Sequence, residues 1–383
     1  MVCTDPLLRV KMSAELKLST RGLSKSWKVQ KSHTCCYTGG KAVLTKDENS
    51  IVCLRNGDVA VVDILTGQVS SSLQDGVDDV VKENFTTFAV HPSGHEIVTA
   101  SNNCLLRHWV HDNSSPKEDG DNVKWECKRS FKSNHTLPIM CMDYDASGTL
   151  VATGSNDQST RVWDVPHGYC THSFKNQGGN ISVVRFHPDG NRLQLFTGTD
   201  GNRSQKCIVR AFDLNTQKTV AEFEDHMSEV TAIVFSTDGW TMCTGSRDKV
   251  LNFYDTRRWK LLKTAPIYES VSGLANVPLD GLGPDARDKK YTMCVASGGT
   301  KGDVRIWGFR EAGKATKRGG AAAAATCTLV GTSEPRQGHG NTADGAKSSD
   351  DSGKGKAYGI TALLCRRSKS QIVSITEEHF FHF

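Results

Sequence analysis

The hydrophobic positions of this chain fall in short runs that are separated by turns and recur along its length. The runs at 230–235 and 241–244, for example, are apolar or alternating and lie on either side of an Asp-Gly turn. Such runs are typical of β-strands, whereas an amphipathic helix places its apolar residues three or four positions apart. Gly ends a comparable turn at 92–94, 146–148, 188–190 and 237–239. Since glycine allows the positive φ of a tight hairpin, the pattern predicts an all-β fold.

A strand marked by an apolar or aromatic residue, usually followed by Asp, recurs once in each unit of this pattern. The marker positions in chain order are Val62, Trp109, Trp163, Phe212, Tyr254 and Trp307. They are 47, 54, 49, 42 and 53 residues apart. A unit of about 40 residues with variable loops is the period of a WD-repeat propeller blade. The units lie near 34–73, 85–131, 137–174, 180–223, 229–264 and 271–330.

A seventh unit begins at Gly359 and is one strand short. Its three expected strands lie at 360–365, 371–375 and 379–383. The alternating run from Trp27 to Lys31 has the length to supply the fourth strand. Pairing the two ends of the chain would close the ring and remove an exposed sheet edge.

The sequence therefore predicts an all-β, seven-bladed WD-repeat β-propeller over residues 25–383, closed by an N-terminal strand and preceded by a disordered extension at 1–24. Two insertions interrupt the repeats. A polar insertion near 111–123 lies between the outer strands of the second unit. The low-complexity segment 313–357 contains five consecutive Ala and many Gly, Ser and Lys residues. It has too few apolar residues to form a core, so it is predicted to be a disordered loop.

A pattern of four residues recurs at the same spacing in two units. The two tetrads are His135, Ser155, Asp157 and Trp163 in one unit and His226, Ser246, Asp248 and Tyr254 in the other. The members of each are 20, 2 and 6 residues apart. A Ser, a His and an Asp also form nucleophilic triads, but one enzyme does not need two. The preferred interpretation is structural: the histidine bridges Asp and Ser and ties the entry loop to the turn and the aromatic strand.

Motifs for catalysis or cofactor binding are not found. The segment from Gly340 to Ser348 resembles a phosphate-binding loop, but Ala346 stands where Lys should follow Gly, and the flanking strand and helix are missing. The 13 cysteines include no C-x-x-C pair, and no Cys/His group has metal spacing. We therefore expect a protein that is not an enzyme, with no cofactor, no metal and no small-molecule substrate.

The net charge of +5 arises in residues 310–369, and the remainder of the chain is close to neutral. This balance argues against a large nucleic-acid-binding face but is compatible with a local basic patch. No apolar run is long enough for a signal peptide core or a membrane span, so we expect no membrane partner. The cysteines are scattered and often lie inside apolar runs, so we expect buried free thiols in a reducing compartment.

One pair of predicted hairpins stands out as a candidate partner surface. In the fifth unit, the hairpin between the first two strands carries Trp240, and the hairpin between the last two carries Arg257, Arg258, Trp259 and Lys260. Both hairpins of a blade lie on the same face of a propeller. Exposed Trp and Arg residues anchor protein interfaces, and Trp also stacks on single-stranded RNA bases. The alternative is that both indole rings pack against neighbouring blades.

Four stretches of the chain resemble a known family. They lie at 168–174, 230–249, 266–271 and 372–379. The segment from Tyr268 to Val271 is the most specific, because a generic propeller has no reason to carry it. Over about residues 20–383, the two insertions excepted, the chain resembles the transducin beta-like protein three family of U3 small nucleolar RNA-associated WD-repeat proteins.

This resemblance implies a role in ribosome biogenesis. Members of the family are non-catalytic scaffolds of the UTP-B subcomplex of the small-subunit processome, the nucleolar particle that processes pre-18S rRNA. The implied partners are other WD-repeat processome subunits and the particle of U3 snoRNA and pre-rRNA, contacted directly or through those subunits. The implied location is the nucleus and the nucleolus. The alternative is a generic WD-repeat protein-interaction adaptor without a role in RNA processing.

The sequence departs from the family in its length. The family pattern has two tandem propellers and a helical C-terminal domain, whereas this chain matches the N-terminal propeller only. We therefore expect a truncated or split gene product, or a form that has lost part of the role. Met12 is an alternative start to Met1, because residues 1–11 resemble nothing in the family.

Overall fold

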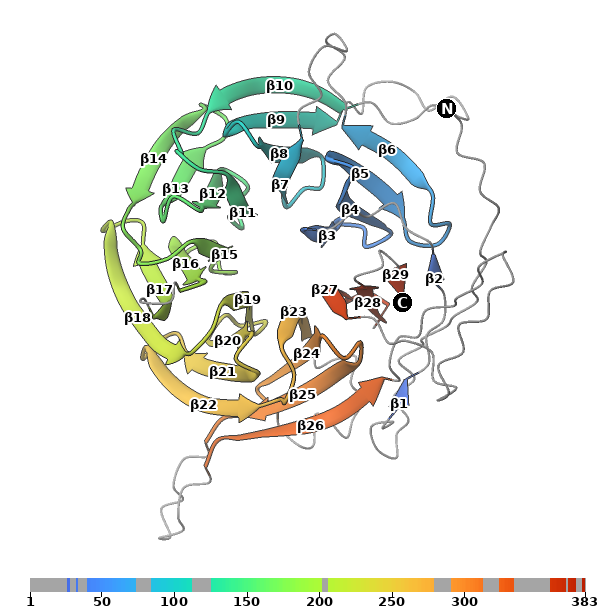
Figure 1. Cartoon of the computed structure of the whole chain (residues 1–383), viewed down its shortest axis with the longest axis vertical. Coiled ribbons are helices and arrows are strands. Elements are labelled where there is room, and N and C mark those ends of the chain that lie inside the picture. The colour runs from blue at the N-terminus through green and yellow to red at the C-terminus, as the bar shows by residue number, and fades with distance from the viewer. Residues whose placement is uncertain are drawn as a thin grey trace, which may run out of the picture.

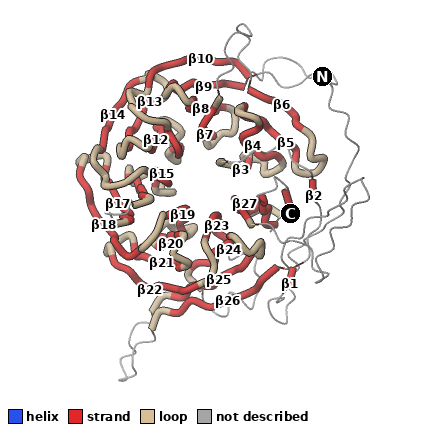
Figure 2. Tube along the Cα trace, in the orientation of Figure 1, coloured by secondary structure: helices blue, strands red, loops and turns tan. Residues whose placement is uncertain are grey.

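The strands of the protein are arranged as sheets around a central axis in the computed structural model (Figure 1). The described residues are 26–27, 32–33, 40–73, 84–111, 125–201, 206–278, 291–312, 324–333, 359–369, 371–376 and 381–382. Across these ranges the regular structure consists of strands joined by turns and loops (Figure 2). They form seven sheets, so the seven-bladed WD-repeat β-propeller predicted from the spacing is confirmed.

Each of the first five blades has four antiparallel strands, which follow the chain from the axis to the rim (Figure 1). Blade one contains β3 (Ala42–Leu44), β4 (Ser50–Arg55), β5 (Asp58–Asp63) and β6 (Val69–Leu73). Blade two contains β7 (Phe85–Val90), β8 (Glu96–Ser101), β9 (Leu105–His111) and β10 (Trp125–Lys132). Blade three contains β11 (Ile139–Tyr144), β12 (Leu150–Ser155), β13 (Thr160–Asp164) and β14 (Tyr169–Phe174). Blade four contains β15 (Ile181–Phe186), β16 (Gln194–Thr199), β17 (Cys207–Asp213) and β18 (Lys218–His226). Blade five contains β19 (Val230–Phe235), β20 (Thr241–Ser246), β21 (Val250–Asp255) and β22 (Lys260–Pro266).

The last two blades include strands from the N-terminal part of the chain. Blade six contains β23 (Val271–Val277), β24 (Met293–Gly299), β25 (Val304–Arg310), β26 (Thr326–Ser333) and, at its edge, β1 (Ser26–Trp27). Blade seven contains β27 (Ile360–Arg366), β28 (Gln371–Thr376), β29 (Phe381–His382) and β2 (Ser32–His33). The two ends of the chain thus share a sheet.

An N-terminal strand closes the ring, but its predicted position was wrong. The closing strand is Ser32–His33, which pairs antiparallel with Phe381–His382. Trp27, the start of the predicted strand, pairs in parallel with Ser333 at the edge of blade six. The chain therefore covers one edge before it completes the next sheet, and each pairing satisfies backbone groups that would otherwise be unpaired.

The core lies between neighbouring blades rather than within one sheet. Between blades one and two, for example, Val59 and Leu73 pack with Phe88, Ile97 and Trp109, all of which are buried. Both faces of a middle strand are covered in this arrangement, so every residue of β20 is buried. The outermost strands are less covered: β14, for example, contains only exposed and partly exposed residues.

A glycine on the second strand of four blades allows the next blade to approach closely. A Cβ at Gly154 would lie 2.5 Å from Cγ2 of Ile181, the first residue of the next blade's inner strand. The glycines in the same position of the other blades are Gly198, Gly245 and Gly298. Any side chain there would separate the blades or force a shift of the backbone.

The predicted low-complexity loop at 313–357 was wrong in one part. Residues 326–333 within it form β26, the fourth strand of blade six. Completion of the sheet stabilises this strand, although its surroundings in sequence are Gly-rich and polar. The rest of that segment apart from 324–325, the extension at 1–24 and nearly all of the polar insertion at 111–123 lie outside the described residues.

Candidate functional site

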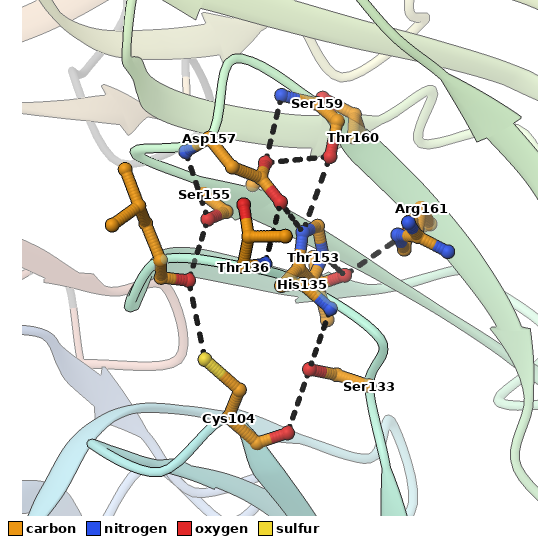
Figure 3. Close-up of polar contacts among 12 residues, drawn as sticks. Cys104, Ser133, His135, Thr136, Thr153, Ser155, Asp157, Ser159, Thr160 and Arg161 are labelled. Atoms are coloured by element: carbon orange, nitrogen blue, oxygen red, sulfur yellow. Dashed lines mark hydrogen bonds and ion pairs between the residues drawn. The ribbon is translucent and has the colours of Figure 1, made fainter.

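A buried chain of hydrogen bonds occupies the entry to blade three (Figure 3). Nδ1 of His135 lies 2.9 Å from Oδ2 of Asp157, and Nε2 lies 2.9 Å from Oγ1 of Thr153. The indole N–H of Trp163 donates to the same threonine oxygen at 3.1 Å. A carboxylate can only accept, so the neutral histidine carries its proton on Nδ1 and accepts the Thr153 hydroxyl at Nε2. The bonds therefore run in one direction from Trp163 to Asp157.

The sequence-based interpretation placed the wrong hydroxyl in this chain. His135 bonds to Thr153, whereas Ser155 donates to the carbonyl of Leu137 at 2.8 Å and accepts the amide of Asp157 at 3.1 Å. Ser155 thus fixes the entry loop to the turn by a separate path. A nucleophilic triad needs a histidine with the carboxylate on one ring nitrogen and the serine hydroxyl on the other. Here the hydroxyl on the other nitrogen belongs to Thr153, and Ser159 lies 3.2 Å from the same Nδ1 that faces Asp157 and donates to that carboxylate at 2.6 Å.

The entry loop of blade three is also bonded to blade two (Figure 3). The Ser133 hydroxyl donates to the carbonyl of Cys104 at 2.6 Å, and the Cys104 thiol lies 3.3 Å from the carbonyl of Leu137. Cys104 has a φ of +59°, in the left-handed region. The cluster therefore joins two blades as well as the strands of one.

Blade five repeats the central bonds. His226 Nδ1 lies 2.9 Å from Oδ2 of Asp248, and its Nε2 lies 2.7 Å from Oγ1 of Thr244. Ser246 donates to the carbonyl of Ser228 at 2.9 Å, so here too the serine holds the entry loop and not the histidine.

The aromatic member differs between the two blades. The hydroxyl of Tyr254 donates to Asp225 of β18 at 3.2 Å, whereas the Trp163 indole donates to the bridging threonine.

The threonine that bonds to the histidine is the residue that sequence reasoning missed. It lies two positions before the tetrad serine, and the same position is Thr or Ser in other blades: the Trp109 indole donates to Thr99 and the Trp307 indole to Ser297.

Blade four shows that glutamine can replace the histidine. Gln177, four residues before β15, accepts the Thr197 hydroxyl at 2.8 Å, as His135 accepts the Thr153 hydroxyl. This native substitution suggests a variant that keeps the bond while removing the titratable ring.

Acid is expected to weaken the fold through His135. Burial lowers its pKa despite the hydrogen bond to Asp157. The unfolded chain, with a pKa near 6.5, therefore takes up the proton first, and this contribution to stability is full above about pH 6.5 and is lost as the pH falls. Urea midpoints of wild type and His135→Gln between pH 8 and 5 test this. The midpoint should fall more steeply below pH 6.5 in wild type, and parallel curves would contradict the prediction.

The described residues offer little reactive chemistry. Burial raises the pKa of Cys141 and Cys294 to about 12, so these thiols stay protonated and are poor nucleophiles. Among the residues that the structure describes, no group of three His, Cys, Asp or Glu side chains could hold a metal ion. In the same residues, no helix has the length and apolar character needed to span a membrane.

The predicted partner surface contains an arginine cluster around Trp240. The Trp240 ring is half-buried, and the guanidinium of Arg257 lies over it at 5.0 Å. A second guanidinium, from Arg192 in the first hairpin of blade four, lies over the ring at 3.8 Å. Sequence reasoning missed Arg192, although it occupies the equivalent hairpin of the preceding blade. Such stacking stabilises both groups and presents positive charge rather than a bare indole.

Trp259 packs inward, as the alternative interpretation expected. It lies against the blade-four core with its ring 6.2 Å from that of Phe196. Arg258 and Lys260 on either side are exposed, and Arg257 and Arg258 both pair with the buried carboxylate of Asp255. The arrangement suits contact with an anionic group, with Trp259 as a structural support.

Replacing Trp259 by Ala is expected to cost about 2 kcal/mol of unfolding free energy, because the ring fills part of an inter-blade core. Trp240→Ala removes a half-exposed ring and should cost less than about 1 kcal/mol. Urea unfolding followed by circular dichroism measures both. Equal losses would show that both rings serve packing.

The comparisons with known proteins agree with the repeat structure. The family model "WD domain, G-beta repeat" matches residues 125–164, 168–202 and 217–255. The chain is 31% identical to transducin beta-like protein 3 of Bos taurus over 77% of its own length and 34% of that protein. It is 30% identical to the Homo sapiens protein of the same name over 71% of this chain and 31% of that protein.

A yeast relative adds a second name. The chain is 27% identical to U3 small nucleolar RNA-associated protein 13 of Saccharomyces cerevisiae over 67% of this chain and 30% of that protein. The chain thus spans about a third of the length of the curated relatives it matches.

Proposed function

Because the chain is a WD-repeat β-propeller homologous to transducin beta-like protein 3, we propose that it is a non-catalytic scaffold subunit in ribosome biogenesis. In this proposal it belongs to the small-subunit processome, supports pre-18S rRNA processing with U3 snoRNA, and resides in the nucleolus. Homology over 71–77% of the chain carries the proposal. The name of the yeast relative, U3 small nucleolar RNA-associated protein 13, supports the RNA connection.

The polar chemistry of the described residues supports a scaffold. The conspicuous His, Asp and Ser side chains of the tetrads are used in bonds between strands and loops. Buried polar groups that satisfy one another stiffen a fold, and a stiff disc presents its loops in fixed positions to partners. The proposed partners are other WD-repeat subunits and the U3 snoRNA and pre-rRNA particle.

Affinity purification of the tagged chain, followed by RNA sequencing and mass spectrometry, tests this function. Co-purification of U3 snoRNA, pre-rRNA and WD-repeat processome subunits is the expected result. Recovery of protein partners with no enrichment of these RNAs over an untagged control would identify a generic adaptor and overturn the proposal.

The arginine cluster provides a matched variant for the same experiment. Arg192→Gln combined with Arg257→Gln and Arg258→Gln removes its positive charge and preserves polarity. If this surface contacts the RNA particle, the variant should retain protein partners and lose RNA after washes with rising salt. Unchanged RNA recovery would mean that the particle is held through other subunits.

A further inference from the structure

Two large apolar side chains are exposed at equivalent positions of adjacent blades. Met227 is 94% exposed and Tyr268 is 74% exposed. Each lies three residues before the first strand of its blade, in the connection that enters β19 or β23. This face is opposite the one that carries Trp240, because the connections between blades and the first hairpins lie at opposite ends of the inner strands. The arginine cluster and this pair are therefore separate surfaces.

One turn of blade five holds both connections. The amide of Met227 donates to Oδ2 of Asp248 at 2.9 Å. The next residue, Lys249, accepts the amide of Ile267 through its carbonyl at 2.9 Å, and Tyr268 follows directly. Met227 and Tyr268 thus flank a single turn whose central residue, Lys249, is exposed and has a φ of +70°. The structure brings together residues that are 41 positions apart in the sequence.

The exposure of Tyr268 is built into the backbone. Tyr268 has a φ of +61°, a conformation that is strained for a bulky L-residue. The next residue, Glu269, turns inward, where its carboxylate is 1% exposed and lies 3.4 Å from Nη1 of Arg305. Arg305 also donates to the carbonyl of Ile267 at 2.9 Å. The buried pair of Glu269 and Arg305 holds the connection between blades five and six in place, and the phenol ring of Tyr268 stays in solvent.

The exposed charged side chains of the turns next to the pair are positive. Arg247, Lys249 and Lys301 all have exposed side chains in the turns next to Met227 and Tyr268. The acids of these turns and connections are less accessible and have partners: Asp248 bonds to His226, Asp303 and Glu269 pair with Arg305, and Glu229 pairs with Arg247. One exposed carboxylate, that of Asp225 in β18, accepts a hydrogen bond from the Tyr254 hydroxyl. A partner that binds here would therefore contact Met227 and Tyr268 next to exposed Arg and Lys side chains.

From this geometry we infer that Met227, Tyr268, Arg247, Lys249 and Lys301 form a docking site for an acidic protein segment that carries apolar side chains. Tyr and Met are enriched at interfaces, where they bury large areas, and complementary charge fixes register and speeds encounter. The inference goes beyond the proposed function, since it does not depend on which assembly contains the protein.

Selection of a random peptide-phage library on the full chain tests the site. Enriched peptides should combine Asp or Glu with Leu, Phe, Trp or Met. Labelled versions should lose about tenfold or more in affinity for Met227→Asp/Tyr268→Asp and for Lys249→Glu/Lys301→Glu. The matched control is Tyr169→Asp/Leu329→Asp, which alters two half-exposed side chains on outer strands and should keep binding.

Several outcomes would overturn the inference. These are the absence of enriched acidic peptides, equal affinity for wild type and both site variants, or equal loss in the outer-strand control. If a site variant loses its cooperative urea transition, Met227→Ser/Tyr268→Ser replaces it in the same assay. A uridine 20-mer is measured in parallel. Its binding, lost in Lys249→Glu/Lys301→Glu while no peptide binds, would assign the surface to RNA instead.

Discussion

Asp248→Ala is expected to lower the free energy of unfolding by about 3 kcal/mol. Oδ2 of Asp248 lies 2.9 Å from His226 Nδ1 and accepts the amide of Met227 at 2.9 Å, while Oδ1 accepts the amide of Val250 at 3.2 Å. Alanine would leave a buried histidine N–H and two amides without these acceptors, and each unmade bond costs about 1 kcal/mol or more. Urea unfolding monitored by circular dichroism gives the difference.

The loss of stability in Asp248→Ala should come from the hydrogen-bond partners of this carboxylate and not only from its place in a turn. Asp213 provides a matched control, because it also caps a turn and accepts the amide of Asn215 at 2.9 Å, and among the described residues it has no hydrogen bond to a histidine. Asp213→Ala should cost about 1 kcal/mol. In a double-mutant cycle, His226→Ala should remove about a third of the sensitivity to Asp248→Ala, because the bonds to the amides of Met227 and Val250 remain. Equal losses at the two aspartates, or additive losses in the cycle, would contradict the role assigned to the cluster.

Fixed offsets explain why the sequence predicted the ring so well. Strands, turns and marker residues recur in each blade, so their order could be established without any three-dimensional information. The closing strand could not be placed in this way. The segments 26–27 and 32–33 are both short, and the choice between them depends on pairing with Ser333 and with Phe381, which lie at the far end of the sequence.

Strand geometry explains the error in the tetrads. Thr153 and Ser155 are two residues apart in β12, so both side chains point to the same face and either hydroxyl satisfies the spacing. The register decides between them. Val151 pairs with Trp163 and Thr153 pairs with Arg161, which places Thr153 diagonally from the indole ring.

Surface chemistry was the least predictable property. Trp240 and Trp259 both lie in hairpins of blade five, yet one carries stacked guanidinium groups and the other packs beside Phe196. Both outcomes depend on blade four, whose loops come close only in the folded ring. Met227 follows a tetrad histidine and gave no signal of exposure, because a methionine near a strand resembles a core residue.

Arg366→Ala is expected to weaken the junction between blades seven and one by about 3 kcal/mol. Arg366 is 1% exposed, and its guanidinium donates to Gln371 at 2.8 Å and to Asn49 of blade one at 3.3 Å. Removing one member of a buried, charged network leaves a cavity and unpaired polar groups. Urea unfolding measures the loss, and hydrogen exchange locates it: amides of β27 and β28 should exchange faster, while those of β16 in blade four should not change.

Two further variants test whether the buried charge of Arg366 or a neighbouring exposed charge stabilises the junction. Arg366→Met keeps much of the volume without the charge, so it should recover part of the lost stability. Lys369 also donates to Asn49, at 2.9 Å, but it is exposed, so Lys369→Ala should cost less than about 0.5 kcal/mol. A short closing strand such as β2 contributes few backbone bonds, so the side chains between the adjacent hairpins must carry much of the closure. Faster exchange in all blades alike would show instead that Arg366 stabilises the whole ring, with no special role at the junction.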